Sequence, residues 1–189
     1  MNYFIVLDLE FNRSNNGFVS ERNGVKLYNE IIQIGAVKLN EDREEIASFS
    51  RIVKPSAYFK MNNEVKQLTG ISTEEIFRGL EFKQALYEFL EWCGADSEII
   101  TWSSTDSLVI KENMAYHGIE YAELPKWYDI QVMFDDQVTM YDRPMPLNYA
   151  IWKLGIKSKP AHTALNDAIN TAKVFCKLDL SNGLNAYSI

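Results

Sequence analysis

Acidic residues stand at three widely separated places in the chain, each beside an apolar stretch. Asp8 and Glu10 end one such stretch, Asp106 follows a second, and His162 precedes Asp167 by five positions. A buried carboxylate is unfavourable unless it is paired or holds a metal, so four gathered in one place would require cations. Ligand sets made only of oxygen select hard ions such as Mg²⁺ or Mn²⁺. The sequence therefore predicts a site for two divalent cations, Mg²⁺ or Mn²⁺, that supports phosphoryl transfer, with the histidine beside it as a base.

Each acidic element also has an ordinary explanation when taken alone. Asp8 and Glu10 lie two apart on a predicted strand and share one face, which could be a polar edge or could carry a phosphatase nucleophile. Asp106 falls in the first turn of a predicted helix, where the helix dipole favours a carboxylate, although the apolar Val109 and Ile110 on the same face indicate that it points inward. The combination of the three elements favours the metal site.

His162 and Asp167 give the sharpest part of the pattern. Within one helix they would be turned about 140° apart, so they can converge only if His162 lies on the entering loop and Asp167 one turn inside the helix. Thr163 is placed to cap that helix. By contrast, His117 precedes a glycine at a helix end and Asp129 is placed as an N-cap, so we assign neither a function.

Apolar periodicity supplies the elements that would position these residues. It predicts five strands, over residues 3–9, 31–39, 46–53, 99–102 and 127–130. It also predicts helices over 62–68, 72–77, 82–93, 105–117, 132–138, 147–154 and 163–178. We expect a mixed α/β sheet in which three antiparallel N-terminal strands are followed by two parallel ones, with helices packed against it. The segment 13–29 is predicted to be a long loop or hairpin near the acidic site.

Length and composition are consistent with one globular enzyme domain over residues 1–189. The chain is 47% hydrophobic and 13% aromatic, and no apolar run approaches the ~20 residues of a membrane span. No basic segment followed by an apolar one starts the chain, so we expect no signal peptide, no membrane association and a cytoplasmic location. Cys93 and Cys176 are predicted to be buried free thiols. The net charge of −7 argues against a long nucleic-acid groove, but bound cations would reverse the local sign.

The three acidic elements together resemble those of a known family. The order Asp-x-Glu, then Asp, then His-x-Ala-x-x-Asp is similar to that of the DEDDh exonucleases, which have the ribonuclease H-like fold. The segment from Glu30 to Val37 resembles that family's second strand, and Leu68-Thr69-Gly70-Ile71 resembles its Leu-Thr-Gly-Ile segment. The likeness covers most of the chain and is greatest to the branch with histone-mRNA and small-RNA 3′ exonucleases and bacterial sporulation-inhibitor exonucleases. Asn12 stands where many members carry threonine, a difference expected to affect a substrate contact at most.

The resemblance implies a 3′-5′ exonuclease that releases nucleoside 5′-monophosphates from single-stranded 3′ ends, with RNA favoured over DNA. One ion would be held by Asp8, Glu10 and Asp167, and the second by Asp8 and Asp106. His162 would deprotonate the attacking water, for which an ordinary imidazole pKa of ~6.5 is suitable. Contacts to the terminal nucleotides are expected from Leu9, Phe11, Leu68, Trp102 and Ser103, although the apolar members could equally be core residues.

Three other functions fit parts of the pattern. A regulatory nucleic-acid-binding module would keep the fold without cutting, and a metal-dependent phosphatase would release inorganic phosphate from a small ester. A polymerase-associated proofreading subunit would prefer DNA. A nuclease assay with and without a chelator distinguishes the first two from an exonuclease, and a comparison of RNA with DNA distinguishes the third.

Overall fold

A six-stranded mixed sheet forms the centre of the computed structural model, which describes residues 3–120, 124–141 and 143–189. The strand order is β6-β5-β4-β1-β7-β8. Their bounds are β1 (Tyr3–Asn12), β4 (Glu30–Leu39), β5 (Glu45–Lys54), β6 (Leu80–Glu81), β7 (Ser97–Thr101) and β8 (Lys126–Asp129). Strand β4 runs antiparallel to β1 and β5, whereas β7 is parallel to β1 and β8 is parallel to β7.

This arrangement confirms the expected α/β fold and corrects the number of strands. All five predicted strands occur with the predicted directions. The sixth, β6, pairs with the end of β5 in parallel. Its two residues are too few to show the alternation from which a strand is recognised.

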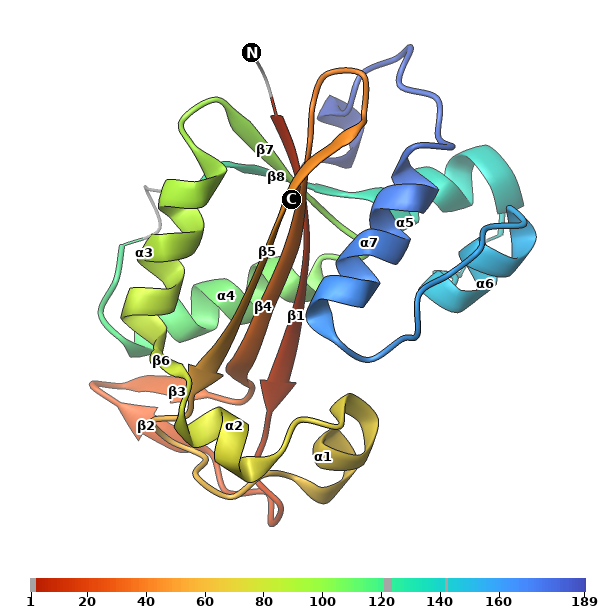
Figure 1. The fold of residues 1–189 in the computed structure, drawn as a ribbon. Coiled ribbons are helices and arrows are strands. Elements are labelled where there is room, and N and C mark those ends of the chain that lie inside the picture. Colours follow the sequence, from red (N-terminus) through yellow and green to blue (C-terminus); the bar gives the residue numbers. More distant parts are fainter. Residues whose placement is uncertain (1–2, 121–123, 142) are drawn as a thin grey trace.

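Helices cover both faces of the sheet (Figure 1). On one side α3 (Phe82–Cys93) and α4 (Thr105–Tyr116) pack on a core to which β1 contributes Ile5, Leu7 and Leu9. On the other side lie α5 (Ile130–Phe134), α6 (Leu147–Lys153) and α7 (Ala164–Phe175), and β1 contributes Val6. Because side chains alternate along a strand, Asp8 and Glu10 continue the face that begins with Val6. The acidic pair of β1 therefore points toward the α7 side.

The helices begin where the sequence predicts and differ by a few residues at their ends. Asn62 caps α1 (Asn63–Thr69), Ser72 caps α2 (Thr73–Phe77), and the Thr163 hydroxyl accepts the Asn166 N–H at 3.3 Å to cap α7. The Asp129 carboxylate caps α5, as expected. Beyond α5 the chain continues as a π-helical turn over Asp135–Thr139, where an α-helix was predicted.

The segment 13–29 folds into a hairpin of β2 (Ser20–Arg22) and β3 (Val25–Leu27), as the hairpin alternative predicted. It packs at the end of α4 that carries Tyr116, whose hydroxyl lies 2.8 Å from the Ser20 hydroxyl. The Arg22 guanidinium lies 4.5 Å from the centre of the same ring. Asp106 begins α4 at its opposite end, so the expectation that this segment borders the acidic site is wrong.

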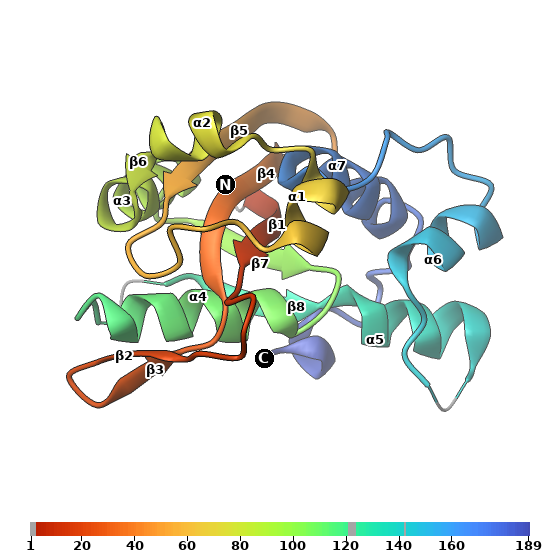
Figure 2. The same ribbon diagram turned by 90° about the horizontal axis from the view of Figure 1, so that it is seen from below.

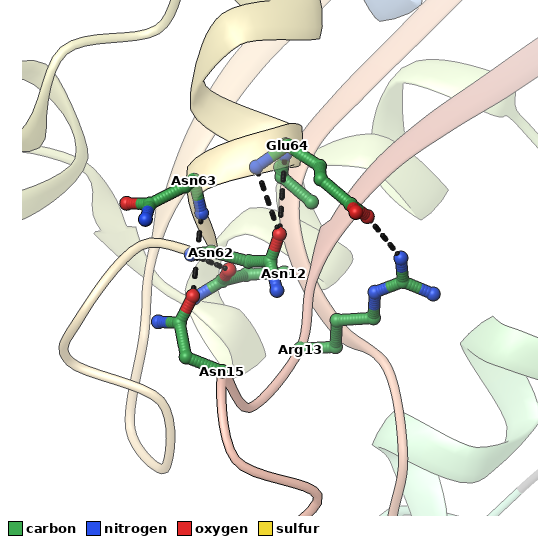
Figure 3. A network of polar contacts seen from close by, with 7 residues as sticks. Asn12, Arg13, Asn15, Asn62, Asn63 and Glu64 are labelled. Carbon is green, nitrogen blue, oxygen red and sulfur yellow. Dashed lines mark hydrogen bonds and ion pairs between the residues drawn. The ribbon is translucent and has the colours of Figure 1, made fainter.

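Asn12 ties the end of β1 to the segment that enters α1 (Figure 3). Its amide nitrogen donates to the carbonyls of Tyr58 at 2.9 Å and Lys60 at 3.3 Å. Its oxygen accepts the Asn62 N–H at 2.8 Å. Nearby, Arg13 pairs with Glu64 at 2.6 Å. Asn12 is fully buried, so its amide stabilises this loop. The sequence had suggested a role in a substrate contact at most. Figure 2 shows α1 at the end of the sheet from below.

The two cysteines differ in environment. Cys93 is buried in the core on the α3 side, whereas Cys176, at the end of α7, is exposed, so the prediction of two buried thiols is wrong for Cys176. Within the described ranges, none of the helices has the length and apolar character needed to cross a membrane.

Candidate active site

The site forms where β1 and β7 separate. The two strands pair in parallel only from Tyr3 to Val6 of β1, and β1 then continues alone on that side. The backbone N–H of Leu9, which lacks a β7 partner there, donates to Asp106 Oδ1 at 3.1 Å. This bond fixes Asp106, at the start of α4, next to the strand that carries Asp8 and Glu10. The carboxyl ends of neighbouring parallel strands are a common place for ligand sites in α/β sheets.

On the other side of β1, a glycine allows α7 to approach. Gly35 of β4 is the cross-strand partner of Asp8. A Cβ added at Gly35 would lie 2.2 Å from the Ala164 carbonyl carbon and 2.2 Å from the Leu165 nitrogen, so the first turn of α7 rests directly on the strand. The Gln33 side chain accepts the Ala164 N–H at 3.0 Å and fixes the same turn. This contact brings Asp167 beside Asp8.

Three carboxylates converge closely enough to share a cation. One oxygen from each of Asp8, Glu10 and Asp167 lies within 4.8 Å of the others. Asp106 is not a member of this group, but its charge acts on Asp8.

Burial raises the pKa of Glu10 to about 7 and that of Asp106 to about 7. Burial, followed by the charge of Asp106, raises the pKa of Asp8 well above its usual range. Like-charged, partly buried oxygens with no bound cation are unfavourable, and this donor set fits a divalent ion.

His162 and Asp167 meet in the way the spacing required. His162 lies on the loop before α7 with φ +72°, and its backbone N–H donates to Asp167 Oδ2 at 2.7 Å. The same loop is held to the helix by Asn170, whose amide accepts the Lys159 N–H at 2.8 Å and donates to the Lys159 carbonyl at 3.1 Å. Sequence analysis did not identify Asn170, although its place three residues after Asp167 puts it on the same face of the helix.

An open hollow of about 780 Å³ adjoins the cluster. It is lined by Asp8, Asp106, His162 and Asp167, together with the predicted substrate residues Trp102 and Ser103. The α6 helix also lines the hollow, through Leu147, Asn148, Ile151 and Trp152. These residues were not among the predicted site residues. The Trp152 side chain is 72% exposed, and an aromatic residue outside the apolar face of a helix is a signal that could have marked it.

The remaining predicted substrate residues lie elsewhere. Leu9 is 4% exposed within the core on the α3 side and points to the face of β1 opposite Asp8, which favours the core alternative given for this residue. Phe11 is half-buried and packs against that same core. Leu68 is 54% exposed on α1.

Comparison with known proteins agrees with this geometry. A family model described as Exonuclease matches residues 5–175. The chain belongs to the exonuclease family. The probable 3′-5′ exonuclease KapD of Bacillus subtilis is 26% identical over 180 residues, which cover 92% of this chain and 83% of that protein. ERI1 exoribonuclease 2 of Xenopus laevis is 27% identical over 206 residues, covering 93% of this chain and 28% of that protein.

The fold is that of the DEDDh exonucleases. The nuclease domain of 3′hExo, a DEDDh family member solved bound to rAMP, superposes with a TM-score of 0.82 at 21% identity, covering 100% of this chain and 96% of that one. The chain is a hydrolase of the 3′-5′ exonuclease class, as its resemblance implied, and acts on nucleic acid. Its cluster of Asp8, Glu10 and Asp167 is suited to the divalent metal that such enzymes use.

Proposed function

We propose that this exonuclease degrades single-stranded nucleic acid from the 3′ end, with RNA preferred to DNA, and releases nucleoside 5′-monophosphates. The observation that carries the proposal is the convergence of the Asp8, Glu10 and Asp167 oxygens within 4.8 Å, with Asp106 bonded to the backbone of the same strand. Similarity to an exoribonuclease and to a domain bound to rAMP supports RNA as the preferred substrate.

Four carboxylates are proposed to hold two divalent cations, Mg²⁺ or Mn²⁺. Asp8, Glu10 and Asp167 would hold one, and Asp8 with Asp106 the other. When bound, the ions would stabilise negative charge on the attacking and leaving oxygens of the phosphodiester. Because the pKa values of Glu10 and Asp106 are each raised to about 7, cation binding below about pH 7 requires these carboxyls to release protons.

His162 is proposed as the general base. Two observations support this role: His162 lines the hollow, and its backbone N–H donates to Asp167, a member of the acidic cluster. The ring would accept a proton from water as the water oxygen bonds to phosphorus. The bond from phosphorus to the 3′ oxygen of the preceding nucleotide would break, and that oxygen would take up a proton from solvent and remain on the shortened strand. Asp167 thus serves both cation binding and the position of the base.

Trp102 and Ser103 are the proposed contacts to the terminal nucleotide, because both line the hollow. Stacking of a base on an aromatic ring contributes about 1–3 kcal/mol and tolerates any sequence. The Ser103 hydroxyl accepts the Thr105 N–H at 3.3 Å, which leaves its own hydrogen available for a phosphate or sugar oxygen. Phe11 and Leu68 remain proposed contacts for the next base along the strand.

The test is a time course on 5′-labelled single-stranded RNA and DNA of equal length and sequence, with Mg²⁺, Mn²⁺ or a chelator. We expect a ladder that shortens one nucleotide at a time from the 3′ end, faster for RNA, and no reaction with the chelator. His162→Ala is expected to slow the reaction by a factor of about 10²–10⁴, the usual contribution of a general base. Release of inorganic phosphate, internal cleavage or faster cutting of DNA would contradict the corresponding part of the proposal.

A further inference from the structure

A second hollow lies beside α7, between that helix, the loop before it and the turn that joins β4 to β5. It is an open groove of about 750 Å³. Its lining carries five basic residues, Arg43, Lys157, Lys159, Lys173 and Lys177, and a single acidic one, Glu45. The whole chain has 19 basic and 26 acidic residues, so the sign of the charge in this groove is opposite to that of the protein. A concave basic surface on an acidic protein indicates an anionic ligand.

The groove is continuous with the active site. Ser158 and Lys159 line both hollows, so they meet across the loop that leads to His162. This loop is held in place by the two hydrogen bonds between Asn170 and the Lys159 backbone. A nucleic-acid strand that enters one hollow can therefore extend into the other along a fixed edge.

Structural roles account for only part of the positive charge. The Arg43 guanidinium donates to the carbonyls of Phe175 at 2.9 Å and Leu178 at 2.7 Å, which satisfies the end of α7, and the Lys173 ammonium donates to the Lys157 carbonyl at 2.8 Å. Within the described parts of the chain, the ammonium groups of Lys157, Lys159 and Lys177 make no hydrogen bond or ion pair. Lys177 has a favourable position at a helix C-terminus, but Lys157 and Lys159 lie on a loop.

We propose that the groove binds the sugar–phosphate backbone of the substrate strand, on the 5′ side of the nucleotides held in the active site. The ammonium groups of the lining suit phosphates, and its apolar residues Leu154, Ile156 and Ile169 suit the sugars and bases. The assignment rests on the proposed function, because it requires a strand whose 3′ end lies at Asp8 and Asp167. Its consequence is that affinity increases with substrate length beyond the active site.

Binding can be measured without catalysis by using 5′-labelled RNA whose 3′-terminal linkages are phosphorothioates, which resist hydrolysis. We would compare a trinucleotide, which fills only the active site, with an oligonucleotide of about 12 nucleotides, within the range of single-strand site sizes. The variants are Lys177→Glu and the double variant Lys157→Glu/Lys177→Glu, because both ammonium groups lack a structural partner among the described residues and line only the groove. A matched control, Lys83→Glu/Lys126→Glu, makes the same charge change at exposed lysines of α3 and β8.

We expect the double variant to bind the long RNA about 10-fold more weakly and the trinucleotide as the wild type does. The slope of log affinity against log salt should fall by about 1.4, or ~0.7 for each phosphate that is no longer neutralised. The control should bind both RNAs as the wild type does and show the same salt slope. Equal losses for both lengths, no loss for the long RNA, or the same loss in the control would each overturn the proposal. Failure of the proposed function would appear separately, as absence of hydrolysis of unmodified RNA.

Discussion

Single side chains at this site carry more than one structural role, and Asp167 is the clearest case. Its carboxylate belongs to the cation cluster, and one of its oxygens accepts the backbone N–H of His162. Asp167→Asn keeps an acceptor for that bond but removes a negative charge. We expect kcat to fall by at least about 100-fold because a cation ligand is lost. In the metal-free protein the free energy of unfolding should not fall, since repulsion with Asp8 and Glu10 is relieved.

The measurements are single-turnover hydrolysis of labelled RNA and urea unfolding in the presence of a chelator. Asn166→Ala, in the same turn of α7, is the matched control and should retain activity. Retention of more than a tenth of the wild-type rate by Asp167→Asn would contradict the ligand assignment.

Asn12 gives a second expectation at this scale, for stability. Its fully buried amide makes three hydrogen bonds to the backbone around α1. Removing it leaves those buried groups without partners, so Asn12→Ala should reduce the free energy of unfolding by about 2–3 kcal/mol. Asn15→Ala, which removes two bonds at an exposed position, should have a smaller effect. Urea unfolding of both variants checks the difference, and equal effects would contradict the role of burial.

At the scale of elements, the contact between β4 and α7 assembles the site. Gly35→Ala would place a Cβ against the backbone of Ala164 and Leu165, which cannot move aside as a side chain can. We expect a loss of about 3 kcal/mol, at the upper end for overpacking, together with displacement of Asp167 from Asp8. The folded fraction should therefore show both lower kcat/KM and a smaller stabilisation by Mg²⁺.

Gly79→Ala is the matched control, because its Cβ would meet the backbone of Ile52 at 2.8 Å, on β5 at the other end of the sheet from β7. It should destabilise the protein without changing the activity of the folded fraction. Thermal unfolding and kcat/KM measured below the melting transition separate the two effects. Full activity in Gly35→Ala would show that α7 does not need this close approach.

The contact between β4 and α7 is an example of a feature that local sequence does not predict, in contrast to the strands and helices themselves. Periodicity predicted the five strands and the order of the helices, and Thr163 was expected to cap α7, because these features depend on local residues. The acidic set was proposed from its pattern, and the structure brings Asp8, Glu10 and Asp167 together. The role of Gly35 could not be inferred, since a glycine within a strand indicates close approach of another backbone without saying which one. Asn12 and the site of the hairpin were misjudged for the same reason: their surroundings are set by segments distant in sequence.

At the scale of the whole molecule, the site couples stability to pH and to metal. Burial raises the pKa of Glu10 from 4.5 to about 7, and that of Asp106 from 3.8 to about 7. The folded metal-free protein therefore holds these protons more tightly than the unfolded chain does. The contribution of these two carboxyls to the free energy of unfolding is greatest below the pKa values that they have in the unfolded chain. It decreases as the pH rises toward about 7.

Mg²⁺ must displace the same protons, so its stabilising effect should be small near about pH 5 and reach its full size above about pH 7. At a free Mg²⁺ concentration of about 100 times Kd the stabilisation is about 2.7 kcal/mol. Melting temperatures measured with Mg²⁺ and with a chelator across this range check both trends. A metal effect independent of pH, or absent throughout, would contradict the carboxylate site; in Asp167→Asn the effect should be largely lost.

The distribution of the acidic residues along the chain has a consequence for biosynthesis. Asp8 and Glu10 leave the ribosome before Asp167, which lies 157 positions after Glu10 and belongs to the α7 helix that docks on Gly35. The group of three carboxylates is therefore incomplete until α7 has been made. We expect a nascent chain that lacks α7 to leave the surrounding nucleic acids intact, so that the onset of activity marks the docking of this helix.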